Sequence, residues 1–388
     1  MFLAVFYFFV EQHSLARRRG KIRLRIAVTG TRGKSTVTRL MAAALREARF
    51  SVLAKTTGSK PVLIFPDGRE EEIKRRGNPT ILEAKKILKK GASLGVGGLV
   101  VEMMSIQPEC ARVESCRILR PHILVITNVR LDHREEQGQS KPEIAASLAS
   151  AVPPHATVFL PEEELRPEFE AAATKVKAKI ISVRKEISRD VASSDQTPWP
   201  GFEENIRLTL AVTDSLGIPR EIAWRGIRRA EPDFGSLKAW QVKLGRPPAT
   251  WTLVSAFAAN EPESTAIILS HLQNSLAPEG RKMIGILNFR KDRGDRSLQW
   301  LEACRDGFFS GFERLYVVGA HVHSLKLKKL ARANGGVVPL TSASPRAVME
   351  RITADEPAGA VLIGMGNMGG LGVELVKLWE EKGKPYGL

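Results

Sequence analysis

Cysteine and tyrosine are scarce in this sequence, and it contains no internal repeat, coiled coil or low-complexity tract. The three cysteines, Cys110, Cys116 and Cys304, have no spacing typical of a metal site, and such an odd, sparse count favours a reducing compartment. No basic stretch is interleaved with aromatic residues, so the usual pattern of a nucleic-acid-binding surface is missing. The lack of that pattern argues against a nucleic-acid-stimulated ATPase.

Acidic residues are also in deficit, with 42 Asp and Glu against 59 Lys and Arg, for a net charge of +17. A positive field of this size attracts polyanions such as nucleic acid, anionic lipid or an acidic polymer. A surface charged for solubility is the alternative, and charge alone does not separate the two. With 388 residues, 43% hydrophobic and 26% charged, the chain is typical of a globular protein of two or three domains.

The apolar N-terminus is too short to cross a membrane by itself. Residues 1–10 are apolar, whereas a spanning helix needs about 20 such residues. The basic residues Arg17, Arg18, Arg19 and Lys21 follow the apolar run, which is the reverse of a signal peptide and favours the cytoplasmic side for the rest of the chain. Residues 1–20 are thus a possible membrane anchor at the cytoplasmic face of the cell membrane, and a buried N-terminal segment is the alternative.

The rest of the chain is organised around Gly30-Thr31-Arg32-Gly33-Lys34-Ser35-Thr36. A β-rich apolar run at 22–28 precedes it, and a run with apolar residues at helical spacing, 37–48, follows it. Strand, glycine turn, Lys-Ser and helix are typical of a phosphate-binding loop. Lys34 can reach the β- and γ-phosphates of a nucleoside triphosphate, and the Ser35 hydroxyl suits Mg²⁺. A plain glycine turn with a solvated lysine is the alternative.

Apolar strands alternate with helical runs along most of the chain, which predicts an α/β protein. The strands of the first half are continuously apolar, so we expect a parallel sheet covered on both faces. A polar loop is expected at 187–201, and a second, smaller α/β pattern starts near residue 235. The predicted divisions are an N-terminal segment at 1–20, an ATP-binding domain at 21–230, a hinge linker at 231–235 and a Rossmann-like domain at 236–388.

Polar residues follow several of the predicted strands. Glu102 ends one apolar strand, and Thr127-Asn128 with Asp132-His133 follow the next. Ligands bind beyond the carboxyl ends of strands in such sheets, so these residues are candidates for metal and phosphate handling. For each one alone, a helix cap or a solvated loop is the alternative.

Two loops of the second half carry similar signals. The segment 288–297 alternates bases with acids after a strand and includes Arg290, Asp292, Arg293 and Asp295. The segment 364–370 is rich in glycine and lies between a strand and a helix. A solvated charged face and a simple turn are the alternatives.

Taken in order, these motifs resemble the Mur ligase superfamily of ATP-dependent amide ligases. Within it the chain is most similar to the ligase subunit of poly-γ-glutamate synthase, the CapB type. The stretches that carry this resemblance are 29–40, Lys55-Thr56-Thr57-Gly58, 64–68, Glu102 with Gln107-Pro108-Glu109, 257–260, 290–296 and Gly364 with Gly366-Asn367. The resemblance implies a parallel-sheet P-loop ATPase domain of Mur ligase type followed by the smaller Rossmann-like domain.

The resemblance also implies a reaction. The γ-phosphoryl group of ATP would pass to a glutamate γ-carboxylate, and the amine of another glutamate would attack the acyl phosphate, building poly-γ-glutamate as a capsule or secreted polymer. The implied catalytic residues are Lys34, Glu102, His133, Arg290, Asp292 and Arg293. The implied ATP-binding residues are the loop from Gly30 to Thr36 with Asn128, Asn205 and Asp295. The implied Mg²⁺ ligands are Ser35, Glu102 and His133.

The implied partners are glutamate, the growing polymer and small membrane subunits of a synthase complex, with membrane association and oligomerisation possible and no nucleic acid expected. No separate uridine-nucleotide-binding domain precedes the phosphate loop, which argues against a cell-wall precursor as substrate. A folylpolyglutamate-type ligase is one alternative. A P-loop ATPase that binds nucleic acid, suggested by the basic charge, is another, and a non-catalytic membrane assembly subunit is a third.

Overall fold

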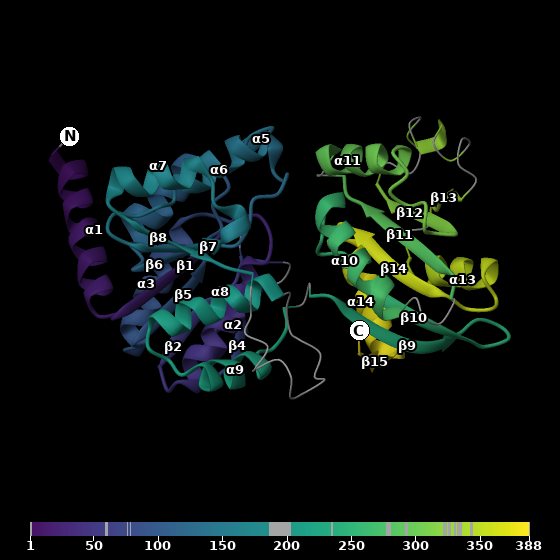
Figure 1. Ribbon diagram of the computed structural model, residues 1–388, viewed down its shortest axis with the longest axis horizontal. Coiled ribbons are helices and arrows are strands. Elements are labelled where there is room, and N and C mark those ends of the chain that lie inside the picture. The colour runs from purple at the N-terminus through teal and green to yellow at the C-terminus, as the bar shows by residue number, and fades with distance from the viewer. Residues whose placement is uncertain are drawn as a thin grey trace. The chain divides into compact units, whose positions relative to one another are not determined.

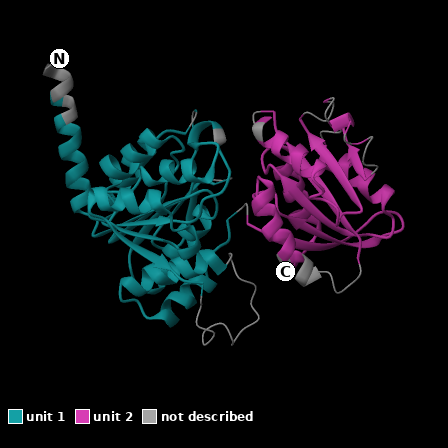
Figure 2. Ribbon diagram, turned by 45° about the horizontal axis from the view of Figure 1, so that its top comes forward, with its two compact units in different colours: residues 1–234 teal, residues 235–388 magenta. Residues whose placement is uncertain are grey.

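The computed structural model divides the chain into two compact units, residues 1–234 and 235–388 (Figure 2). The residues that it describes are 2–58, 61–75, 77, 79–185, 203–233, 236–276, 281–291, 294–320, 324, 327–329, 331, 336–341 and 344–387. The loop expected at 187–201 lies outside these residues. Each unit contains a mostly parallel sheet with helices, so the predicted α/β class is confirmed.

The sheet of the first unit has the strand order β4-β3-β2-β5-β1-β6-β7-β8 (Figure 1). Strands β2, β5, β1, β6, β7 and β8 are parallel to their neighbours, whereas β3 and β4 are added antiparallel at one edge. The strands are β1 (Leu24–Thr29), β2 (Val52–Lys55), β3 (Val62–Ile64), β4 (Glu70–Glu72), β5 (Gly98–Glu102), β6 (Ile123–Ile126), β7 (Thr157–Pro161) and β8 (Lys179–Val183). The helical elements are α1 (Phe2–Gly20), α2 (Lys34–Glu47), α3 (Leu82–Leu94), α4 (Pro108–Arg112), η1 (Val113–Leu119), α5 (Arg134–Gln137), α6 (Lys141–Ala149), η2 (Glu162–Glu164), α7 (Pro167–Val176), α8 (Glu203–Ser215) and α9 (Arg220–Arg228).

Both faces of this sheet are buried, which explains why its strands are continuously apolar. Successive residues of a strand point to opposite faces, so Ile26 and Ala27 of β1 belong to different core clusters. Ala27 packs in the cluster that includes residues of α3, α6 and α7, and Ile26 packs in the one that includes residues of α2, α8 and α9. Because helices cover both faces of the sheet, a ligand can bind only at the ends of the strands, and the polar residues follow their carboxyl ends.

Helix α1 is attached to the first unit through its C-terminal half. Leu15 is buried in the core, and the Arg19 guanidinium donates to the carbonyl oxygens of Arg117 (2.9 Å) and Ile118 (3.0 Å). Towards its start the helix leaves Phe6 58% and Phe9 71% exposed. Within the described residues, no helix combines the length and the apolar character needed to cross a bilayer.

The second unit has its own sheet, in the order β13-β12-β11-β14-β10-β9-β15. The run from β13 to β10 is parallel, and the hairpin of β9 and β10 adds antiparallel strands at one edge. The strands are β9 (Lys238–Leu244), β10 (Ala249–Ser255), β11 (Met283–Phe289), β12 (Arg314–Gly319), β13 (Val337–Pro339), β14 (Val361–Gly366) and β15 (Lys384–Tyr386). The helices are α10 (Pro262–Leu276), α11 (Gly294–Arg305), α13 (Pro345–Asp355) and α14 (Leu371–Lys382).

Several elements were not expected from the sequence. Strand β4 consists of three exposed glutamates, β9 mixes buried and partly exposed residues, and the edge strand β15 has no buried residue. The helix expected near 109–119 is split, because α4 continues into the π-helical η1. These differences lie at sheet edges and in a helix on one face, so the parallel centre of each sheet is as predicted.

The close contact between α2 and α9 provides a test of the packing in the first unit. A β-carbon on Gly226 would lie 2.6 Å from both the Ala43 carbonyl oxygen and the Ala44 α-carbon, which are backbone atoms that cannot move aside. We expect Gly226→Ala to lower the free energy of unfolding of this unit by about 1–3 kcal/mol in urea denaturation, as overpacking does. Gly20→Ala is the matched control, since a β-carbon there meets nothing within 4 Å; equal stability of the two variants would contradict this packing argument.

Candidate active site

The predicted phosphate loop joins β1 to α2 and depends on two glycines. Gly30 and Gly33 have φ values of 121° and 79°, in the region that favours glycine. A β-carbon on Gly30 would lie 2.2 Å from Thr127 Oγ1, and one on Gly33 would lie 2.5 Å from Asn205 Oδ1. Packing against the end of β6 therefore leaves no room for a side chain at Gly30, where the Thr127 backbone nitrogen is also close, and the positive φ favours glycine at position 33.

The end of β6 holds the phosphate loop in place. The Arg32 N–H donates to Asn128 Oδ1 (3.0 Å), and the Thr31 N–H donates to the Asn128 carbonyl oxygen (3.0 Å). Thr127 Oγ1 donates to the Arg32 carbonyl oxygen. Asn128, predicted to bind nucleotide, thus uses its side chain to shape the backbone of the loop.

Lys34 and the start of α2 provide positive charge at the loop. Lys34 Nζ donates to the carbonyl oxygens of Gly30 (2.7 Å) and Thr31 (3.0 Å), so the ammonium group lies over the loop itself. The helix begins at Lys34, and its first N–H groups add the partial positive charge of a helix N-terminus. This arrangement suits the phosphates of a nucleotide.

The structure brings Ser35 and Glu102 together. Ser35 Oγ donates to Glu102 Oε2 over 2.8 Å, and the Thr57 N–H donates to the same oxygen over 2.6 Å. Glu102 is only 3% exposed and lies beside Val28 of β1 in the parallel register of β5 and β1. A hydroxyl and a carboxylate next to a phosphate loop are oxygen donors that fit a hard divalent cation such as Mg²⁺.

His133 lies in the loop after β6. Its ring nitrogen Nε2 is 3.6 Å from Asp132 Oδ2, and Asp132 pairs with Arg32 of the phosphate loop over 3.1 Å. Among the residues that the structure describes, no three His, Cys, Asp or Glu side chains gather as a metal site. The proposed role of His133 as a metal ligand therefore stays a prediction.

Sequence reasoning missed a group of charges around Asn205. Asn205 is 4% exposed at the start of α8, next to Glu204. Glu204 lies 3.7 Å from Arg130, which follows β6. Burial raises the pKa of the Glu204 carboxyl above its ordinary value, Arg130 opposes that shift, and the negative charge of Glu164 adds to it. The wall beside the phosphate loop thus contains a carboxyl that is poorly solvated.

A second carboxylate beside Ser35 was also missed. A β-carbon on Gly58 would lie 2.6 Å from Ser35 Oγ and 3.2 Å from Asp233 Oδ2, so both side chains border the same glycine. Asp233 is 3.6 Å from the Arg39 guanidinium, which also binds Glu70 of β4 and the Glu231 carbonyl oxygen. Arg39 stands one helical turn after Ser35, a spacing that could have indicated a shared site.

In the second unit, the loops after β11 and β14 interlock. Asn288 Nδ2 donates to the carbonyl oxygens of Asn367 (2.6 Å) and Gly369 (3.1 Å), and the Arg290 guanidinium lies against Gly369. The structure therefore brings two of the motifs predicted from the sequence to one end of this sheet. Asp292 and Arg293 lie outside the described residues, as does the side chain of Asp295.

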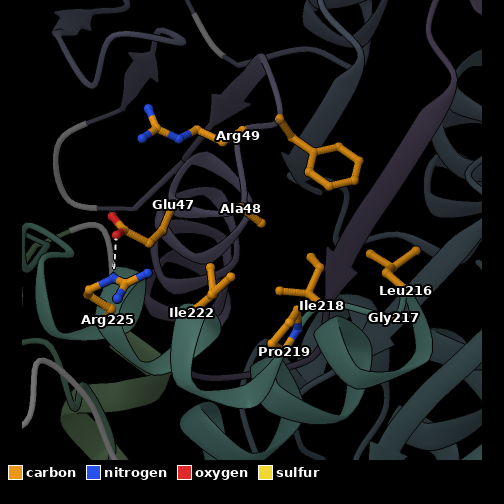
Figure 3. Close-up of a pocket in the computed structure, with 10 residues that line it drawn as sticks. Glu47, Ala48, Arg49, Leu216, Gly217, Ile218, Pro219, Ile222 and Arg225 are labelled. Carbon is orange, nitrogen blue, oxygen red and sulfur yellow. Dashed lines mark hydrogen bonds and ion pairs between the residues drawn. The ribbon is translucent and has the colours of Figure 1, made fainter.

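A separate pocket of about 350 Å³ lies at the other end of α2, where Glu47 binds Arg225 over 2.6 Å (Figure 3). It is lined by the end of α2, the turn after α2, the turn before α9, and α9, and none of the predicted site residues is among the lining residues. Because α2 has 14 residues, about 20 Å of helix separates this pocket from the phosphate loop.

Comparison with known families gives two matches that together span most of the chain. Residues 28–201 match the Mur ligase middle domain, and residues 243–382 match the poly-gamma-glutamate synthase CapB C-terminal domain.

Two curated relatives agree with these matches. The capsule biosynthesis protein CapB of Bacillus anthracis is 31% identical over 303 residues, which are 76% of this chain and 63% of that protein. The PGA synthase CapB of Bacillus subtilis (strain 168) is 32% identical over 280 residues, which are 71% of this chain and 70% of that protein. The alignment thus spans less than two thirds of the first relative's length.

Among solved structures, the fold is similar to a bifunctional folylpolyglutamate synthase/dihydrofolate synthase from Yersinia pestis, complexed with AMPPNP and a Mn ion. The TM-score is 0.64 at 13% identity, covering 95% of this chain and 92% of that one. MurF from Acinetobacter baumannii gives a TM-score of 0.63 at 16% identity, covering 94% and 79%. At these identities the likeness concerns the fold alone.

The half-buried carboxyl of Glu204 leads to a prediction about pH. Because its pKa is raised in the folded protein, the stability associated with its protonated form is present at low pH and is lost as the pH rises through that raised pKa. We expect Glu204→Gln, which stays neutral, to have a higher melting temperature than the parent above this pKa. The difference between the two melting temperatures should shrink as the pH falls through this pKa towards the ordinary value of 4.5.

Glu203→Gln is the matched control, because Glu203 is the exposed neighbour of Glu204 on the same helix. A melting-temperature difference of the Glu204→Gln variant that does not vary with pH, or that grows on acidification, would contradict the prediction.

Proposed function

The chain belongs to the CapB family of poly-γ-glutamate synthases, and from that membership we propose that it is an ATP-dependent amide ligase that joins glutamates through their γ-carboxylates. The observation that carries the proposal is the contact between Ser35 and Glu102 beside the phosphate loop of Lys34. This contact combines oxygen donors for a cation with a cradle for phosphate, which a phosphoryl-transfer site needs.

The first step is the transfer of the γ-phosphoryl group of ATP to a glutamate γ-carboxylate, giving an acyl phosphate and ADP. Lys34 and the N-terminal N–H groups of α2 bind the phosphates. They also reduce the repulsion between the two anions that must meet, ATP and the glutamate carboxylate. Ser35 and Glu102 are the residues that would hold Mg²⁺, which neutralises phosphate charge when bound. The hydrogen bond from Ser35 to Glu102 holds the Ser35 hydroxyl and the Glu102 carboxylate next to each other, so these oxygens are preorganised for a cation.

The second step is the attack of a glutamate amine on the acyl phosphate, which forms the amide and releases phosphate and a proton. Arg290, in the loop after β11, lies among interlocked loops of the second unit and is a candidate for binding the anionic groups of substrate. An acyl phosphate hydrolyses readily, so the reaction needs a site from which water is excluded.

Poly-γ-glutamate is favoured over folylpolyglutamate as the product. The folylpolyglutamate synthase resembles this chain in fold, whereas the relatives above 30% identity and the match to the C-terminal domain both belong to poly-γ-glutamate synthesis. The net charge of +17 also suits a polyanionic product.

We expect Lys34→Ala to reduce glutamate activation about 10²–10³-fold, as loss of one preorganised charge donor does. The measurement is the hydroxamate formed from purified protein with ATP, Mg²⁺, glutamate and hydroxylamine, which traps the acyl phosphate. Lys175→Ala, an exposed lysine on α7, is the control and should keep the parental rate. An unimpaired Lys34→Ala variant would refute the proposed site.

We further propose that α1 attaches the protein to an anionic membrane surface. Attachment there would bring the protein to partner subunits in the membrane. Support comes from the exposed Phe6, Phe9 and Val10 near the start of the helix and from Arg17 and Arg18 near its end. Apolar groups next to cations are the pattern of an interfacial helix.

The test is co-sedimentation with vesicles containing anionic lipid. Phe6→Ser with Phe9→Ser should release most of the bound protein, because apolar insertion is lost. The control is Leu298→Ser, which removes a 44% exposed apolar side chain from the second unit. Binding that the paired substitution leaves unchanged would disprove attachment through α1.

A further inference from the structure

The second unit contains a groove of about 680 Å³ between the hairpin of β9 and β10 and the helices α13 and α14. The residues around it include Gly245 and Arg246 of the hairpin turn and Pro357, which precedes β14. The groove therefore lies at the amino ends of β10 and β14, whereas Asn288, near the carboxyl end of β11, and Asn367, just after β14, lie at the opposite end of the sheet. Within this unit it is a site separate from the loops of the candidate active site, none of whose predicted residues lines it.

The floor of the groove is apolar. Val242 of β9, Leu253 of β10, Met349 of α13, and Leu378 and Trp379 of α14 line it and are buried. The Trp379 ring is fixed by stacking on Phe257, with ring centroids 5.8 Å apart. The floor is thus a preformed surface on which methylene groups can pack.

The rim of the groove is positive. Arg246, Arg346 and Lys382 are exposed, and none of them forms an ion pair with a described residue. Among the described lining residues only Glu350 is acidic. By contrast, Arg351, on the same helix as Arg346, pairs with Asp355 over 3.0 Å. The rim therefore holds cations whose charge is available to an anionic ligand.

We propose that this groove binds a segment of the γ-linked glutamate chain, an inference that rests on the proposed function. In a γ-linked chain each carboxylate is attached directly to the main chain, and two methylene groups separate it from the next amide. Such a polymer presents regularly spaced anions and apolar carbons together, which matches the cationic rim and the apolar floor. The groove holds polymer at a place distinct from the loops that bear Arg290.

The test uses the full-length protein and a fluorescently labelled γ-linked glutamate oligomer, with binding measured by fluorescence anisotropy. The groove variant carries Arg246→Glu, Arg346→Glu and Lys382→Glu. The control variant carries Lys243→Glu, Lys377→Glu and Lys384→Glu, which change the net charge equally but stand on β9, α14 and β15 outside the lining of the groove. Lys243 is well matched, since it lies between two lining residues of β9.

We expect the groove variant to bind the oligomer at least about tenfold more weakly and the control variant to stay within about twofold of the parent, at the same salt concentration. Both variants should form the hydroxamate from ATP and monomeric glutamate at the parental rate, because neither alters the phosphate loop. A set with Gln in place of Glu at the groove positions, checked by thermal unfolding, separates loss of binding from loss of folding.

Equal weakening in the two Glu variants would overturn the proposal, because the attraction would then come from the overall charge. Equal affinity for an α-linked glutamate oligomer of the same length would overturn the fit to the γ-linked chain. A parent that binds the oligomer but forms no hydroxamate would refute the proposed reaction and leave the groove as an anionic-polymer site. The failures of the two ideas are thus distinguishable.

Discussion

The first unit depends on the close approach of the loop after β1 to the ends of its neighbours. With glycine at positions 30 and 33, the backbone can lie against Thr127 and Asn205, and Thr127 and Asn128 can then bind the loop through its own amides and carbonyls. A β-carbon at position 30 would lie 2.8 Å from the Thr127 backbone nitrogen, which cannot move aside, and the positive φ at position 33 favours glycine there. The same approach places the start of α2, with Lys34 and Ser35, next to Glu102.

Charges buried around this loop are compensated by specific partners. Glu102 accepts two hydrogen bonds, and Lys55, which is fully buried one strand away, pairs with Glu83 over 3.0 Å. Nearby, burial raises the pKa of Glu114, while its hydrogen bonds from Ser105 and the charge of Lys55 oppose the shift. A buried ion is costly unless it is paired, so the concentration of such groups at this end of the sheet indicates a function there rather than a gain in stability.

The sequence was sufficient for the parts that depend on local pattern. The parallel strands could be predicted because both of their faces are apolar, and Glu102 could be singled out because a carboxylate ended such a strand. The strand β9 was missed because Gln241 and Lys243 interrupt its apolar run, and β15 was missed because none of its residues is buried, which weakens the apolar signal. Glu204 and Asp233 were missed because their neighbours, Arg130 and Arg39, are distant in the chain, and only the folded structure reveals such contacts.

Arg39 connects α2, the helix that bears Ser35, to the segment that contains Glu231 and Asp233. It stands one turn after Ser35 on α2, and it binds the Glu231 carbonyl oxygen and Asp233, at the end of the segment that leads out of the first unit. Linkage requires that, if a ligand at α2 has different affinities when this segment is held and when it is released, the ligand shifts the equilibrium of the segment by the same factor. The Arg39 guanidinium is the group through which such a coupling would pass, because it contacts the segment and stands on the helix that bears Ser35.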